Sequence, residues 1–306
     1  MYKIMVSRTK IISEHAMPIP GLTIIGESIN DSVPSTHELF EAGKIDEILD
    51  LARSQDEKGA AYIDVNVGRR PPGFMADLVR KIQQVTAKPL SIDTPDPEIA
   101  AAGLEAYDPG RADGKRPILN SIAWTRVAMF DLYRIRPFIP ILLVTERIDA
   151  GGEARMNHTA EETYRTARDF VRIAAERIDG FTADACILDP GIMPIGSDLD
   201  GNFRRLMESL RLIHGDPELN GVSLSVGLSN FTVMLPSKCA DGSPVRGPLE
   251  SAFLTLAMPL GLNTVIGSVR RNYRILPVDH PALRCLRDIL ALEGYDVVMR
   301  VMSFYS

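Results

Sequence analysis

Eight short segments rich in Ile, Leu and Val alternate along this chain with longer segments whose apolar residues recur at helical spacing. The strand segments are residues 22–30, 62–68, 89–95, 117–123, 138–146, 184–191, 223–230 and 264–269, and the helical segments are residues 44–59, 74–86, 97–107, 160–178, 202–215, 248–261 and 281–294. Strands that helices cover on both faces have such apolar runs, so the alternation indicates a parallel sheet. Strict alternation of eight units fits a closed barrel better than a doubly wound sheet, and we predict an α/β fold with a single (β/α)8 TIM barrel.

The length of the chain is consistent with one domain of this kind. Its 306 residues are close to the roughly 250 of a typical (β/α)8 barrel. Hydrophobic residues make up 45% of the chain, which is enough to bury a sizeable core. We therefore assign residues 21–306 to the barrel and residues 1–20 to an N-terminal extension that packs over the barrel or a partner.

Charge and cysteine content argue against several classes of protein. The net charge of −6 disfavours nonspecific binding of nucleic acid, which depends on clustered Lys and Arg. No apolar run approaches the roughly 20 residues of a membrane span. The three cysteines, Cys186, Cys239 and Cys285, are far apart and form neither a disulfide framework nor a zinc motif. We expect a cytoplasmic protein without nucleic-acid or membrane partners.

Polar residues close seven of the predicted strands. They are Asn30, Asn66, Asp93, Asn120, Glu146, Asp189 and Asn230. The carboxyl ends of barrel strands converge on the face where active sites are built. At any single position these residue types also serve as helix caps and turn formers, but their repetition favours a polar pocket. Two long segments, 147–159 and 231–247, have the Gly, Pro and polar content of mobile loops, and on this face either could form a lid or a docking surface.

The chemistry available to this pocket is that of carboxylates and amides. The chain has no GxGxxG, Walker A, HExxH or GxSxG motif, and its five histidines do not close strands. We therefore predict no metal site. A carboxylate such as Asp93 or Asp189 can accept two hydrogen bonds from an amidine-like edge, and Asn120 can both donate and accept. This combination suits a flat heterocycle such as a pterin.

Seven segments resemble the pterin-binding barrel family in order and spacing. They are GESIN (26–30), YIDVNVG (62–68), SIDTPDPEIAAAGLEA (91–106), ILNS (118–121), LDPGIMPIG (188–196), GLSN (227–230) and AFLTLAMPLGLNTVI (252–266). This family contains dihydropteroate synthase, the folate domain of cobalamin-dependent methionine synthase and the methyltetrahydrofolate:corrinoid protein methyltransferases. The methyltransferases have a similar Gly-Glu-x-Ile-Asn opening and a similar Gly-x-Ser-Asn end of strand seven. Dihydropteroate synthases have a Ser-Arg-Lys sequence there instead, so the resemblance favours the methyltransferase branch.

The resemblance implies a transfer of the N5-methyl group between methyltetrahydrofolate, or a related tetrahydropterin, and the cobalt of a separate corrinoid protein. Asp93, Asn120 and Asp189 would hold the pterin ring, and Asn230 would lie beside N5 and stabilise its protonated form. We assign Asn230, Asp93 and Asp189 to catalysis. The resemblance further implies that the protein is a homodimer. It also implies that cobalamin is carried by the separate corrinoid protein and that this protein binds no metal of its own. The remaining candidate binding residues are Glu27, Asn30, Asp64, Asn66, Gly227, Ser229, Lys238 and Arg270.

Some features depart from the methyltransferase pattern and leave alternatives open. Thr94-Pro95 replaces the usual Ser after Asp93, and Lys238 takes the place of a basic residue that often follows strand seven. The Arg270-Arg271 pair resembles the last strand of dihydropteroate synthases. A synthase that condenses a pterin pyrophosphate with an aryl amine is therefore one alternative. A pterin-binding subunit without catalytic activity is another.

Overall fold

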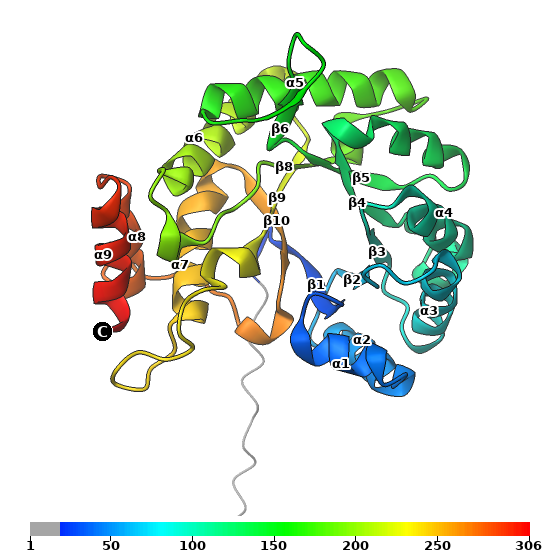
Figure 1. Cartoon of the computed structure of the whole chain (residues 1–306), viewed down its shortest axis with the longest axis horizontal. Helices are drawn as coiled ribbons and strands as arrows, with labels where there is room; N and C mark the ends of the chain where they lie inside the picture. The colour runs from blue at the N-terminus through cyan, green and yellow to red at the C-terminus, as the bar shows by residue number, and fades with distance from the viewer. Residues whose placement is uncertain (1–18) are drawn as a thin grey trace, which may run out of the picture.

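The computed structural model describes residues 19–306, and these form a closed barrel of eight parallel strands (Figure 1). The strands are β1 (Thr23–Asn30), β2 (Tyr62–Asn66), β3 (Leu90–Asp93), β4 (Ile118–Ala123), β5 (Ile139–Leu143), β8 (Ile187–Asp189), β9 (Ser223–Gly227) and β10 (Leu262–Gly267). The barrel closes where β1 pairs with β10, from Thr23 opposite Thr264 to Gly26 opposite Gly267. The predicted (β/α)8 TIM barrel is confirmed.

Helices surround the strands in a ring, as Figure 1 shows. They are α1 (Pro34–Glu41), α2 (Ile45–Glu57), α3 (Pro72–Val85), α4 (Pro97–Ala106), α5 (Ala160–Arg177), α6 (Asn202–His214), α7 (Arg246–Ala257), α8 (Pro281–Ile289) and α9 (Tyr295–Tyr305). Local sequence explains their starts: Asp96 caps α4, and Thr159 with Glu162 forms a capping box at α5. Between β4 and β5 the helical unit is a 3₁₀ segment, η2 (Trp124–Arg134).

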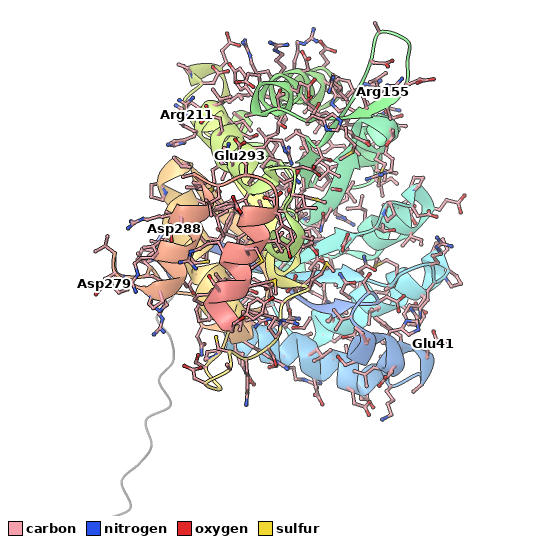
Figure 2. All side chains as sticks on the ribbon, turned by 60° about the vertical axis from the view of Figure 1, so that its left-hand side comes forward. Glu41, Arg155, Arg211, Asp279, Asp288 and Glu293 are labelled. Carbon is pink, nitrogen blue, oxygen red and sulfur yellow. The ribbon has the colours of Figure 1, made fainter. Side chains whose placement is uncertain are left out.

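Two hydrophobic layers hold the barrel together. The larger core lies between the strands and the helices, while Ile25, Ile118, Ile141 and Ile187 pack together as a separate cluster. These four isoleucines lie on four different strands and form a cluster separate from the core that faces the helices, so their side chains point into the barrel. Charged side chains such as Glu41, Arg155 and Glu293 point away from the barrel at its outer surface (Figure 2). The inward isoleucines therefore make an apolar floor inside the barrel.

The loop after β5 differs from the prediction. Residues predicted as a mobile loop form an antiparallel hairpin of β6 (Glu146–Ile148) and β7 (Ala154–Met156). Glu146 begins this hairpin and does not close β5, which ends at Leu143. The turn of the hairpin is stabilised by the Asp149 carboxylate, which accepts hydrogen bonds from the backbone N–H groups of Gly151 and Glu153. The Glu146 carboxylate accepts a hydrogen bond of 2.9 Å from the Thr125 hydroxyl.

The loop after β9 is anchored at its far end. Its backbone bridges Lys238 to Pro244, and the Ala240 N–H donates to the Tyr305 carbonyl at 3.0 Å. Asn230 was predicted to close this strand, but it lies in the 3₁₀ segment η6 (Leu228–Thr232) that follows β9. The loop thus packs against the end of α9, a helix that the sequence analysis did not predict.

Two predictions concern the N-terminal extension and membrane-spanning helices. Almost all of the predicted extension, residues 1–20, lies outside the described residues. From residue 19 onward, no helix combines the length and apolar character needed to cross a bilayer.

Candidate active site

A layer of polar side chains lies above the apolar floor, toward the carboxyl ends of the strands. Two residues beyond Ile25, Ile118 and Ile187, the same strands carry Glu27, Asn120 and Asp189. The strand period of two directs these side chains to the same inward side as the isoleucines. The face predicted for the active site is thus lined with carboxylate and amide groups.

Two neighbouring carboxyl groups, those of buried Asp64 and partly buried Asp93, occupy the β2 and β3 side of this layer. Asn66 Nδ2 donates to Asp93 Oδ2 at 2.9 Å, and Asn120 Nδ2 approaches Asp64 Oδ1 at 3.4 Å. Burial, followed by the neighbouring charge of Asp93, raises the pKa of Asp64 well above its usual value. Burial also raises the pKa of Asp93, while hydrogen bonds from Asn66 and Asp64 oppose that rise. The two neighbouring carboxyl groups therefore resist carrying two negative charges at once.

Asp189 lies at the end of β8 and is only 6% exposed. The Gly191 N–H donates to its Oδ1 at 2.8 Å, and the Ser225 hydroxyl donates to its Oδ2 at 3.1 Å. Burial raises the pKa of Asp189 to about 6, and these two hydrogen bonds limit the rise. Gly191 has a φ of +72°, and a Cβ there would lie 2.4 Å from Thr145 Cγ2, so the turn that positions its N–H requires glycine.

Glu27, Ser229 and Asn230 meet near the barrel closure. The Ser229 hydroxyl donates to Glu27 Oε1, which links η6 to β1. Asn230 is exposed, and its amide lies close to Gly227 at the end of β9. A Cβ added to Gly227 would lie only 2.9 Å from Asn230 Nδ2. Burial raises the pKa of Glu27. Glycine at position 227 therefore leaves the space that the Asn230 amide occupies.

The other predicted site residues lie further from these groups. Asn30 Oδ1 accepts the Ser32 N–H at 2.8 Å and so stabilises the turn after β1. Lys238 is exposed in the loop that packs against α9. Arg270 is exposed in η8 (Val269–Arg271), and its backbone N–H donates to Ser268 Oγ. Roles for these three residues in ligand binding stay predictions.

The sequence analysis missed two polar residues beside the site. Glu250, in the second turn of α7, is fully buried, and Arg271 Nε lies 3.4 Å from its Oε2. Ser225, which donates to Asp189, was also missed. In the sequence, Glu250 stands out only as an acidic residue within an apolar helical segment. Such a residue is ordinarily assigned to the exposed face of a helix.

The polar layer can bind a flat, polar heterocycle. Asp93 and Asp189 offer carboxylate oxygens for N–H donors, and the Asn120 amide offers both a donor and an acceptor. Asp64 Oδ2 is buried and has no hydrogen-bond partner among residues 19–306, so the layer has unused hydrogen-bonding capacity. Within the same residues, no group of three or more His, Cys, Asp or Glu side chains is arranged to hold a metal ion. This donor set fits the hydrogen-bonding edge of a pterin.

Two known proteins are similar in sequence to most of this chain. A methylcorrinoid:tetrahydrofolate methyltransferase of Eubacterium limosum is 27% identical over 262 residues, which is 80% of this chain and 84% of that protein. A methionine synthase of Mycobacterium leprae is 23% identical over 304 residues. That alignment covers 94% of this chain and only 24% of the much longer synthase.

Solved structures of dihydropteroate synthases share the fold. The enzyme of Xanthomonas albilineans with 4-aminobenzoic acid has a TM-score of 0.56 and 19% identity, over 89% of this chain and 93% of that one. The enzyme of Thermus thermophilus has a TM-score of 0.55 and 17% identity, over 82% and 89% of the two chains. At such low identity this likeness shows the fold alone.

The family itself follows from a match over most of the barrel. Residues 29–267 match the model of the pterin binding enzyme family, a range that begins in β1 and ends with β10. All of the strand-end groups described above except Glu27 lie within this range. The resemblance seen in the sequence motifs is thereby confirmed, and the chain belongs to the family of pterin-binding enzymes.

Proposed function

We propose that this protein transfers a methyl group between N5 of a tetrahydrofolate-type pterin and the cobalt of a corrinoid carried by a separate protein. The observation that carries the proposal is the Ser229-Asn230 pair at the end of β9, where the dihydropteroate synthase pattern has a lysine. The relative from Eubacterium limosum, whose name describes this reaction, supports the same choice. The homodimer and the cytoplasmic location remain predictions.

Recognition of the ring would fall to Asp93, Asn120 and Asp189. The two carboxylates would accept hydrogen bonds from the exocyclic amine and ring N–H groups of the pterin, and Asn120 would bond to its alternating donors and acceptors. Asp64 would support them, because its Oδ1 lies within hydrogen-bond distance of the Asn120 amide and helps to hold that amide in place. Charge-assisted hydrogen bonds in a buried site each contribute about 1.5–3 kcal/mol, so these contacts can orient the ring.

The chemical step would depend on the state of N5. A tertiary amine is a poor leaving group unless N5 gains a proton or a strong hydrogen bond. The Asn230 amide cannot supply a proton, but its oxygen can accept a hydrogen bond from protonated N5. The corrinoid supplies the cobalt that donates or accepts the methyl group. Because Asn230 is exposed at the barrel mouth, a partner could bring its corrinoid to N5 from the solvent side.

The test is a single-turnover assay with methyl-labelled methyltetrahydrofolate and reduced cobalamin. We expect transfer by the wild type, and a rate about 10²- to 10³-fold lower for Asn230→Ala with little change in pterin affinity. Asn220→Ala is a matched control, because Asn220 is exposed before the other end of β9. Equal rates for Asn230→Ala and the wild type would refute the assigned role.

Two further outcomes would replace the proposal. Sustained condensation of a pterin pyrophosphate with p-aminobenzoate would identify a synthase, an activity with which the exposed Arg270 is compatible. Tight binding of methyltetrahydrofolate without transfer to any reduced corrinoid would identify a pterin-binding subunit.

A further inference from the structure

A second pair of acidic side chains, Glu27 and Glu250, lies beside the site and has no part in the recognition described above. Glu250 belongs to α7 and is fully buried. The Thr232 hydroxyl donates to its Oε1 at 2.5 Å, whereas its Oε2 has no hydrogen-bond partner among the described residues. The guanidinium of Arg271 lies 3.4 Å from that Oε2 and is the nearest compensating charge.

One cation cannot neutralise both Glu250, which is buried, and Glu27, which is partly buried. Burial raises the pKa of Glu27, and burial together with the nearby charge of Glu27 raises the pKa of Glu250, while Arg271 lowers both. Tyr273 packs against the same groups, and burial followed by the charges of Glu250 and Glu27 keeps its phenol protonated by raising its pKa. Four groups thus face one another, namely Glu27, Glu250, Arg271 and Tyr273. Like charges that share one cation favour a state in which one acid holds a proton.

The contacts indicate which acid holds the proton. Glu250 is paired with Arg271 and accepts from Thr232, and both contacts favour its ionised form. Within the part of the chain that the structure describes, the Glu27 carboxyl group has a hydrogen bond only with the neutral Ser229 hydroxyl. The direct ion pair with Arg271 favours Glu250 as the ionised member, so we assign the proton of the pair to Glu27, whose carboxyl group contacts Ser229.

We propose that Glu27 supplies the proton that N5 needs, acting through the Ser229 hydroxyl, with Glu250 and Arg271 setting its charge. The proposal rests on the proposed function, which puts N5 beside Asn230, the residue next to Ser229. When Glu27 is protonated, its carboxyl group can donate to Ser229 Oγ, and the Ser229 hydroxyl can turn its own hydrogen toward N5. Ser229 can then pass its proton to N5 while it receives the proton of Glu27.

The step balances in both directions. In transfer to the corrinoid, the proton moves from the Glu27 carboxyl group to N5, and the N5–methyl bond breaks with its electron pair left on N5. The cobalt donates an electron pair to the methyl carbon and is formally oxidised from I to III, while N5 becomes a secondary amine and Glu27 a carboxylate. In methylation of tetrahydrofolate, the Glu27 carboxylate takes up the proton that N5 loses. Solvent restores the proton or removes it between turnovers.

The test is the pH dependence of the single-turnover rate of methyl transfer from methyltetrahydrofolate to reduced cobalamin. We expect the wild-type rate to fall as the pH rises through the pKa of Glu27, because the ionised acid has no proton to give. Glu27→Gln keeps an acceptor for Ser229 but removes the proton. It should lower the rate about 10²- to 10⁴-fold and abolish this pH dependence, while pterin affinity stays unchanged.

Two other variants keep the test decisive if Glu27→Gln folds poorly. Ser229→Ala should lose the rate as Glu27→Gln does, whereas Ser229→Thr, which keeps a hydroxyl, should retain most of it. Glu250→Gln removes a like charge and frees Arg271 for Glu27, so the fall in rate should move to lower pH. Glu293→Gln is the control, because this glutamate lies at the outer surface (Figure 2) with 84% of its side chain exposed.

Failure of this inference differs from failure of the proposed function. A wild-type rate and pH profile in both Glu27→Gln and Ser229→Ala would overturn the proton relay and leave methyl transfer intact. Absence of transfer by the wild type at every pH would overturn the proposed function, and the relay with it.

Discussion

The two pairs of acids in this barrel, each with one buried and one partly buried member, differ in what surrounds them. Asp64 and Asp93 contact the side-chain amides of Asn120 and Asn66, and within residues 19–306 neither forms an ion pair. Glu27 and Glu250 share Arg271, whose side chain is 32% exposed. Burial raises the pKa of all four carboxyl groups. A pair without a cation keeps its proton and serves as a fixed recognition element, whereas a pair that shares a partly exposed cation can release a proton and recover it.

The largest effect should come from removing an acceptor of the first pair. Asp93→Ala deletes a charge-assisted contact to the pterin and the partner of both Asp64 and Asn66. We expect the Kd for methyltetrahydrofolate, measured by titration calorimetry, to rise about 10²- to 10³-fold. Asp77→Ala, at an exposed position of α3, is the control and should leave Kd unchanged. If Glu250→Ala weakens binding as much as Asp93→Ala does, the division of roles between the pairs is wrong.

Removing the cation of the second pair should destabilise the fold. Arg271→Met leaves Glu250 and Glu27 without compensation, and we expect a loss of about 1–3 kcal/mol in the free energy of unfolding at pH 8. The loss should be smaller at pH 5, because both acids can then be protonated. Urea denaturation at the two pH values measures it. Arg204→Met removes a surface ion pair with Glu293 and should cost less than about 1 kcal/mol at either pH.

The single carboxylate of β8 should make pterin binding depend on pH. The pKa of Asp189 is raised to about 6, and only its ionised form accepts two N–H donors. Affinity should therefore fall as the pH drops through 6, with binding about tenfold weaker at pH 5 than above pH 7. Fluorescence titrations at several pH values would measure the slope. The Asp189→Asn variant should bind the pterin weakly at every pH and should lose the fall in affinity near pH 6. If the variant shows the same dependence of affinity on pH as the wild type, the titrating group is not Asp189.

The smallest effect should come from replacing the shared proton of the first pair. Asp64→Asn introduces an amide that can donate to Asp93 and cannot ionise. Because folding raises the pKa of Asp64, the wild type loses stability as the pH rises above the usual value for aspartate. We expect the variant to be more stable by on the order of 1 kcal/mol at pH 8, with a smaller gain at pH 5. A lower stability at pH 8 would mean that Asp64 is ionised in the folded protein.

Sequence patterns were sufficient for the barrel and for part of its lining. The period of two places Asn120 and Asp189 in line with apolar inward residues, so their position could be predicted. The β6–β7 hairpin could not, because strands of three residues are too short for alternation to stand out. The 3₁₀ segment after β4 was also missed, since a 3₁₀ helix has three residues per turn and lacks the α-helical spacing of apolar residues by which helices were predicted.

The sequence by itself determined the eight barrel strands, their order and the residue types at the strand ends, because these depend on patterns within short windows of the chain. The tertiary structure decided which acids share a proton or a cation. Glu27, Glu250 and Arg271 are far apart in the chain and meet only because β1 pairs with β10 as the barrel closes. The pKa of a carboxyl group depends on burial and on charges brought from other elements, and neither exists before the barrel forms.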